Sequence, residues 1–448
     1  MKRKVSRVSV WRLVIGVAGL ASIWACGSTS GCNGCTPTPL PGGFDQKHRM
    51  DNGMQVRISE SGIGFVENNF ETMVTQLVPG GLTFTIPKTT TSSQKICASG
   101  PPCTANIDIT SVDITPTPKS TAKLNMRAKI KTSKIKFEMK VWLIGWVGCD
   151  VSFDSSASGK KDLGMLADID FVVQATKNNK LTIAVGKTEL KDFENGDIKI
   201  SGGVHCTVVN WLKGLFKSTI EKQLLKVVDD TVAAMLKDLP MGQEGRFDMA
   251  SFMSSFSPRT TGVMDYFMWA GGYADAENKG MSLGVMSGFR AAKHNNCVPN
   301  CELPGATCKA PAKAAIPRST TFRGNKRPGG KSFDVGIGVH KQSLEVASYA
   351  MYSSGGLCLD IDTGAVPQLS SAMFSILVPS LNTLTGGNNV PMLLSVRPRN
   401  PPTVELGKGT YHKDKSGTIV IDDPLITLKA KDFAADVYVL VDERFVRV

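Results

Sequence analysis

Apolar and polar residues follow two different periods along the chain, and the change between them predicts the order of elements. From Cys206 to Leu236 the apolar residues recur at the i, i+3, i+4, i+7 spacing of one helix face, and charged residues occupy the opposite face. A helix over 208–236 is about 43 Å long at about 1.5 Å per residue. Because so long an apolar stripe needs a long partner surface, we expect this helix to pack on a sheet.

A shorter helix and a series of strands are predicted before it. Gln55–Ser59 alternates as a strand, Ser61 can cap a helix, and apolar residues on one face extend that helix over about 63–78. As far as Gly203 the period is two, which is typical of half-buried strands. The expected strands lie at 82–86, 107–109, 112–114, 124–130, 135–141, 167–173, 181–185 and 198–200. We expect an antiparallel meander with one apolar face, flanked by two amphipathic helices.

Periodicity is lost over 291–331, which is rich in Cys, Pro, Ala and Lys, and then returns. A short apolar helix is predicted around 369–381. Strands are predicted at 333–339, 393–396, 403–406, 419–421, 426–428 and 437–441. The expected organisation is a signal peptide at 1–25, a tether at 26–50, a first domain at 51–290, a linker at 291–331 and a second, abbreviated or truncated β-rich domain at 332–448.

The order helix, antiparallel strands, long helix resembles that of the bactericidal/permeability-increasing and lipopolysaccharide-binding proteins, members of the tubular lipid-binding superfamily. The stretch QVRISESGIGF at 55–65 is similar to that family's first strand and helix, and Lys237–Pro240 to the exit of its long helix. Cys149 and Cys206 resemble the two cysteines that tie sheet to helix there. The resemblance covers about 51–290. It implies an α+β fold with an elongated, curved antiparallel sheet wrapped on long amphipathic helices, and a second related barrel that is incomplete.

The resemblance also implies that sheet and helices enclose acyl chains. The residues expected to line this lipid site are Phe70, Met73, Val74, Leu77, Trp211, Leu215, Phe216, Ile220, Leu224 and Val228. The expected function is lipid binding or lipid transfer, with phospholipid or lipopolysaccharide as the ligand. Ordinary core packing produces the same periodicity, so a structural or adhesive envelope protein without a ligand is the alternative.

Residues 1–25 have the pattern of an export signal. Basic residues precede the apolar run Leu13–Ala25, which is too short to span a bilayer. Ile23-Trp24-Ala25-Cys26 resembles a bacterial lipobox, in which the cysteine is lipidated, although Trp24 stands where a small residue is usual. Ordinary cleavage or an uncleaved anchor are the alternatives. We expect an exported lipoprotein at a bacterial membrane, periplasmic or at the outer membrane.

The chain has 11 cysteines, of which ten remain if Cys26 is lipidated. An even number in an exported chain indicates disulfides, and the resemblance implies that Cys149 pairs with Cys206. The other cysteines fall into the neighbours Cys32 and Cys35, the neighbours Cys97 and Cys103, and the loop group Cys297, Cys301 and Cys308, for which Cys358 is a fourth partner. The spacing in that loop fits no zinc pattern, and no metal is expected.

The formal charge is +13, and removing the five basic residues before position 26 leaves 13 − 5 = +8. This excess favours anionic surfaces such as a membrane. No aromatic–basic motif indicates nucleic acid. The basic run Lys119–Lys140 is either a solvated outer face of a hairpin or a patch that binds lipid headgroups. The headgroup-binding residues in the second interpretation are Lys129, Lys131, Lys134 and Lys136.

One motif raises the possibility of an enzyme. Gly280–Gly284 fits G-x-S-x-G, in which Ser282 would be the nucleophile on a tight strand–turn–helix. The flanking residues instead predict a hairpin turn at 277–280 followed by a strand. The five histidines stand singly, without a partner at metal-ligand spacing. We therefore expect a protein without catalysis or cofactor, and the pattern makes no prediction of oligomeric state.

Overall fold

The structure is a computed structural model of the chain. It describes residues 39–77, 81–98, 103–117, 122–142, 144–155, 162–175, 178–203, 205–206, 213–237, 241–249, 253, 257–312, 314–320, 323–327, 330–376 and 378–448. Within these ranges, the side chains of 76–77, 213–216, 228 and 231–237 are not described.

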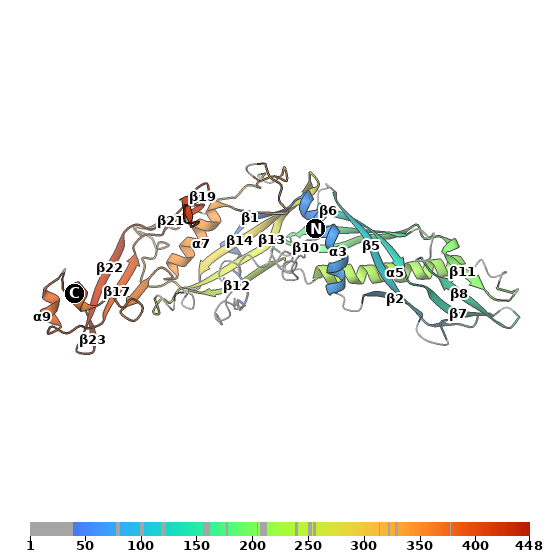
Figure 1. The fold of residues 1–448 in the computed structure, drawn as a ribbon, viewed down its shortest axis with the longest axis horizontal. Helices are drawn as coiled ribbons and strands as arrows, with labels where there is room; N and C mark the ends of the chain where they lie inside the picture. The colour runs from blue at the N-terminus through green and yellow to red at the C-terminus, as the bar shows by residue number, and fades with distance from the viewer. Residues whose placement is uncertain are drawn as a thin grey trace.

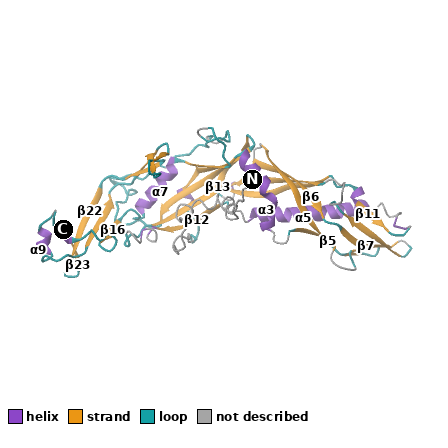
Figure 2. Ribbon diagram, in the orientation of Figure 1, coloured by secondary structure: helices purple, strands orange, loops and turns teal. Residues whose placement is uncertain are grey.

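The molecule is elongated and curved, and its sheets follow one another along the long axis (Figure 1). Strands predominate over helices (Figure 2), and the strand pairs of the described residues are antiparallel. The largest sheet has ten strands. In spatial order they are β15 (Val335–Val339), β1 (Arg49–Ile58), β14 (Gly280–Ala291), β13 (Val263–Glu277), β10 (Lys180–Lys191), β9 (Leu163–Gln174), β6 (Ala122–Thr132), β5 (Cys103–Thr117) and β2 (Leu82–Ile86), with β12 (Gly242–Asp248) also paired to β13.

The remaining strands form smaller sheets. A five-stranded sheet consists of β11 (Ile198–Ser201), β8 (Trp146–Phe153), β7 (Ile135–Trp142), β4 (Gln94–Ile96) and β3 (Thr89–Thr90). A four-stranded sheet consists of β16 (Leu359–Asp362), β17 (Met392–Pro398), β22 (Phe433–Val441) and β23 (Arg444–Arg447). Two pairs complete the set, β18 (Thr403–Leu406) with β21 (Ile426–Lys429) and β19 (Thr410–Lys413) with β20 (Ile419–Asp423).

The described helices are few. The two longest are α3 (Glu60–Leu77) and α5 (Lys213–Lys237). The others are η2 (Gln46–His48), η4 (Asn195–Asp197), α7 (Lys341–Ser353), α8 (Ser371–Phe374) and α9 (Ser380–Leu384). The expected curved, mostly antiparallel sheet is confirmed, whereas the described helices are few and are not the long amphipathic helices that the resemblance implies. Of the helix predicted over 208–236, residues 208–212 lie outside the described part.

Several predicted elements need correction. The two strands expected at 107–109 and 112–114 are one strand, β5, with a register shift between Ile109 and Ser111 against β6. The helix expected over 369–381 is two short helices, α8 and α9. The meander is divided between two sheets, because β7 and β8 pair with β4 and β11 and not with β6.

Helix α7 is absent from the sequence-based expectation. The His340 side chain caps it by accepting a hydrogen bond from the Gln342 N–H at 3.3 Å. Val346, Tyr349 and Ala350 are buried at the i, i+3, i+4 spacing. The helix packs on β14. Strand β15 pairs with β1, so residues after the predicted linker belong to the same sheet as the first predicted domain.

The hairpin turn predicted at 277–280 is confirmed. Asn278 and Lys279 join β13 to β14 with φ of 50° and 55°, and Glu277 pairs with Gly280. Asn178 and Asn179 precede β10 with φ of 57° and 58°. Asparagine tolerates this left-handed region, which the two-residue loop at 278–279 requires at both positions. These turns fix the register of the strands that present the candidate site.

Candidate lipid-binding face and membrane-facing tip

Apolar residues line one face of the ten-stranded sheet in two groups of strands. Residues opposite each other on antiparallel strands share a face, so the register identifies which side chains lie together. Leu124 of β6 pairs with Ile169 of β9, which pairs with Val185 of β10. Towards the other end of the strand order, Val56 of β1 pairs with both Ile337 of β15 and Leu283 of β14. We call this the inner face.

Helices cover part of the inner face. α5 packs against β10 and β2, and α3 packs against β5. Ile220 and Leu224 of α5 are each 1% exposed and belong to the same core as the inner-face residues of the sheet. The strands of the five-stranded sheet contribute Phe137, Met139, Val151 and Phe153 to this core.

Another part of the inner face is only half covered. Leu124 and Val185 are half-buried although they flank the buried Ile169 in one cross-strand row. The half-buried inner-face residues are Ile109, Val112, Ile114, Leu124, Val173, Ile183 and Val185. We call these residues the apolar strip. They lie on four strands, with buried residues such as Ile169 between them, and they leave apolar surface in contact with water. A hydrocarbon chain that covered it would gain about 0.8 kcal/mol per buried methylene.

The residues predicted to line the lipid site do not all lie in one described cluster. Phe70 lies half-buried against the core that contains Ile220 and Leu224. Val74 is buried and Met73 half-buried on α3, and neither belongs to that core cluster. Trp211 lies outside the described residues, as do the side chains of Leu77, Leu215, Phe216 and Val228. At Ile220 and Leu224 protein already covers the helix face, so the open apolar surface is on the strands.

The predicted headgroup patch is partly neutralised. Lys131 lies 3.5 Å from Asp162, and the hydrogen bond from Thr110, followed by the charge of Lys131, lowers the pKa of Asp162. In the same basic run, Lys123 lies 2.9 Å from Asp170, and their hydrogen bond raises the pKa of Lys123. Such exposed pairs contribute little to stability.

The four lysines of this patch are also spread over two sheets and the connection between them. Lys129 is exposed on β6, which belongs to the ten-stranded sheet. Lys134 and Lys136 are exposed too, but Lys134 lies in the connection after β6 and Lys136 lies on β7 of the five-stranded sheet. A solvated outer face is therefore the simpler interpretation of this basic run.

An exposed aromatic hairpin was missed from the sequence. Strand β7 ends at Trp142 and strand β8 begins at Trp146, and the two rings face each other across the hairpin with centroids 5.5 Å apart. The rings are 49% and 39% exposed, and Ile144 between them is fully exposed. The Lys95 Nζ lies 4.4 Å from the Trp146 ring centroid. This tip lies at one end of the molecule (Figure 1). The signal in the sequence is two tryptophans around Gly145, between two alternating stretches.

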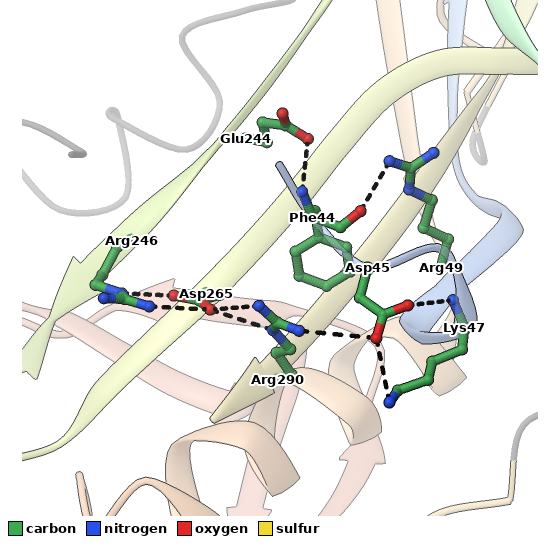
Figure 3. Close-up of polar contacts among 8 residues, drawn as sticks. All are labelled: Phe44, Asp45, Lys47, Arg49, Glu244, Arg246, Asp265 and Arg290. Carbon is green, nitrogen blue, oxygen red and sulfur yellow. Dashed lines mark hydrogen bonds and ion pairs between the residues drawn. The ribbon is translucent and has the colours of Figure 1, made fainter. Parts of the chain in front are cut away.

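The outer face of the ten-stranded sheet binds the segment that precedes β1. Phe44 is 3% exposed, and its ring stacks on Phe267 with centroids 5.7 Å apart. The fully buried Asp265 accepts hydrogen bonds from Arg246 and Arg290, and Arg290 reaches towards Asp45 at 3.9 Å (Figure 3). These contacts fix the first described residues to the sheet, upstream of the start expected near Gln55.

Lysine and arginine side chains border the same aromatic group. Lys180 Nζ lies 3.9 Å from the Trp269 ring centroid, and burial lowers the pKa of Lys180. Arg49 stacks over Phe267 at 4.2 Å and donates a hydrogen bond to the Phe44 carbonyl at 2.9 Å. The cluster is closed by the protein's own Phe44, so it serves as an anchor.

Ser282 does not have the geometry of a hydrolase nucleophile. It lies within strand β14, is 2% exposed, and accepts a hydrogen bond from Arg57 at 3.1 Å. Arg57 is itself fully buried, and burial lowers its pKa. No histidine or carboxylate is hydrogen-bonded to the Ser282 hydroxyl among the described residues. The motif is a strand that follows a hairpin turn, as its flanking residues predict.

Four disulfides are present in the described residues. The cysteines that the family resemblance pairs, Cys149 on β8 and Cys206 before α5, are joined with their Cα atoms 5.7 Å apart. The other pairs are Cys97–Cys103, Cys297–Cys358 and Cys301–Cys308. Within the described ranges, no group of three or more His, Cys, Asp or Glu residues could hold a metal ion. No described helix is long and apolar enough to cross a bilayer.

Two solved structures share a distant similarity with this chain. No family model matches the sequence, and no curated protein matches it. The structure is similar to a crystal structure of lipopolysaccharide binding protein, with a TM-score of 0.38 and 11% identity over 88% of this chain and 76% of that one. It is also similar to Takeout 1 of Epiphyas postvittana, with a TM-score of 0.24 and 9% identity over 40% of this chain and 91% of that one. Scores this low carry no argument about what this chain does.

Proposed function

We propose that the protein binds lipid and holds acyl chains against the inner face of the ten-stranded sheet. The observation that carries this proposal is the half-buried apolar strip across β5, β6, β9 and β10. Apolar surface that stays accessible on one face of a sheet often marks a binding groove. An acyl chain matches such a strip, because it is apolar, long and without hydrogen-bonding groups that the strip would leave unpaired.

We further propose that the β7–β8 tip contacts the membrane surface from which the lipid is taken. Tryptophan favours the boundary between headgroups and hydrocarbon, because its ring is apolar and its N–H is polar. The lysine next to Trp146 would lie at the depth of anionic phosphates. The expected lipidation of Cys26 would hold an exported protein at the same membrane. The rival hypothesis, an envelope scaffold, requires neither open apolar strip nor exposed aromatic tip.

The lipid-binding proposal can be tested with two neighbouring tryptophan substitutions. Ile183 and Ala184 are adjacent on β10, but Ile183 lies half-buried on the inner face whereas Ala184 is exposed on the other. Ile183→Trp should displace about two methylenes of a bound chain, which corresponds to about 1.6 kcal/mol, or about tenfold in affinity. Ala184→Trp should leave the bound lipid unchanged.

The measurement is native mass spectrometry of the purified wild type and both variants, with thermal unfolding as a check of the fold. A wild type without extractable lipid would refute the proposal and favour the envelope scaffold. Equal lipid content in the two folded variants would show that the strip is not the binding surface.

A further inference from the structure

Glu67 is an acid on the face of α3 that packs on the sheet. Ile63 and Val74, one turn before and two turns after it, are 7% and 5% exposed, and Phe70 is half-buried against the core. Carboxylates seldom lie among apolar neighbours without a partner. The partner here is the backbone of β5, because the Glu67 Oε1 accepts a hydrogen bond from the Ile114 N–H at 2.5 Å.

The strand that Glu67 reaches has an open edge. β2 pairs with β5 only between Cys103 and Ile107. Beyond Ile107, the described strands pair with β5 on its β6 side alone. An open edge presents backbone N–H and C=O groups that need partners. Helix α3 lies along this edge, and Glu67 satisfies one of its N–H groups.

The two halves of α3 are held in different ways. The first turn is tied to other elements by Glu60 with Lys279 at 2.8 Å and by Ser61 with Asp334 at 2.5 Å. After Ser61, among the side chains that the structure describes, Glu67 makes the only polar contact from α3 to the sheet. The remaining side-chain hydrogen bonds of α3, such as that of Asn69 to the Phe65 carbonyl, stay within the helix.

We propose that an acyl chain reaches the inner face through the seam between α3 and the open edge of β5. Glu67 keeps this seam closed through its hydrogen bond with the Ile114 N–H. The inference rests on the proposed lipid binding. Val112 and Ile114 line the seam on β5 and are half-buried, and Leu124 lies on the next strand. Parting the Glu67 hydrogen bond and the apolar contacts of Phe70 and Val74 would connect this strip to the outside. The first turn, where Ser61 is hydrogen-bonded to Asp334 and Ile63 is buried, would keep the helix attached.

The test follows transfer of phosphatidylcholine with a fluorescent acyl chain from vesicles to the protein by stopped flow. Glu67→Ala should speed uptake and release together by about tenfold, since hydrogen bonds to charged groups contribute on that scale, and the amount bound at equilibrium should not change. Glu67→Gln, which keeps a neutral acceptor, should be intermediate. Glu71→Ala, at an exposed position one turn further along α3, should behave as wild type.

Hydrogen exchange provides a readout that does not depend on lipid. The Ile114 amide should exchange faster in Glu67→Ala, whereas amides of β9 should not change. Unaltered transfer rates in a variant with a faster Ile114 amide would place the route elsewhere and overturn the proposal. A lowered unfolding temperature with reduced binding would make Glu67 a structural residue and overturn it too. A wild type that takes up no labelled lipid would refute the proposed function itself.

Discussion

Phe44 illustrates how one side chain fixes a segment whose composition resembles a tether. Its ring lies over Gly288, where an added Cβ would come within 2.6 Å of the ring. Glycine at 288 therefore creates the space that Phe44 fills. Arg290 and Arg49 hold the segment from either side, Arg290 by stacking over the Phe44 ring and Arg49 by its hydrogen bond to the Phe44 carbonyl.

Phe44→Ala should lower the free energy of unfolding by about 3 kcal/mol, because it removes a buried ring and leaves a cavity over Gly288. Phe433→Ala, at a position that is 51% exposed on β22, should change it by less than about 0.5 kcal/mol. Urea unfolding followed by circular dichroism measures both. Equal effects at the two positions would mean that the anchor does not stabilise the body of the protein.

For single residues, the sequence pattern predicts which face of a strand or helix a side chain occupies, but not how exposed that side chain is. Alternation places Ile169, Leu124 and Val185 on one side of their strands, yet the first is buried and the other two are half-buried. This difference comes from tertiary packing, which alternation does not encode. Glu67 was missed because a single acid on a helix of mixed composition carries no signal until its partner strand is known.

Elements are predicted well where their period is long and regular. The alternation of β6, β7 and β9 identified these strands to within a few residues, because each has one side in the core. Helix α7 was missed because its buried face consists largely of small or hydroxylated residues such as Ser343 and Ser348. The pairing of β15 with β1 joins residues almost 300 positions apart in the sequence, and no local pattern encodes it.

The disulfide between Cys149 and Cys206 links the five-stranded sheet to the chain entering α5. It closes a loop with a sequence separation of 57. The chain-entropy model gives about 4 kcal/mol for a loop of this size and about 2 kcal/mol for the loop between Cys301 and Cys308, whose separation is 7.

Replacing both Cys149 and Cys206 by alanine should therefore destabilise the protein more than replacing Cys301 and Cys308. The measurement is the midpoint of guanidinium unfolding without reductant. A larger loss from the shorter loop would show that native contacts, rather than loop closure, dominate. Peptide mapping without reduction checks that the remaining bonds are unchanged.

At the scale of the whole molecule, the exposed apolar side chains lie in more than one region. The β7–β8 tip carries Trp142, Ile144 and Trp146 at one end of the long axis (Figure 1). Elsewhere, Tyr411 of β19 and Phe433 of β22 are 65% and 51% exposed. Exposure alone does not decide which region meets a membrane. The tip differs because its two rings face each other beside a lysine, whereas Phe433 lies among the strands of a small sheet.

This difference can be tested in a Cys26→Ser background, which removes the proposed lipid anchor. Cys26→Ser should first move the protein from the detergent phase to the aqueous phase, and labelled fatty acid should enter only the wild type. If the wild type incorporates no fatty acid, the anchor is excluded and the tip remains to be tested in the unaltered chain.

In that background, Trp142→Ser with Trp146→Ser should weaken binding to vesicles of phosphatidylethanolamine and phosphatidylglycerol. Burying the exposed half of each ring contributes about 1 kcal/mol, so the pair should account for at least about tenfold in affinity. Tyr411→Ser with Phe433→Ser removes comparable exposed aromatic surface away from the tip and should have no effect. If the second pair weakens binding and the first does not, the C-terminal sheets face the membrane. The tip would then lie in water, away from the membrane, and lipid would have to cross the aqueous phase to reach the seam beside α3.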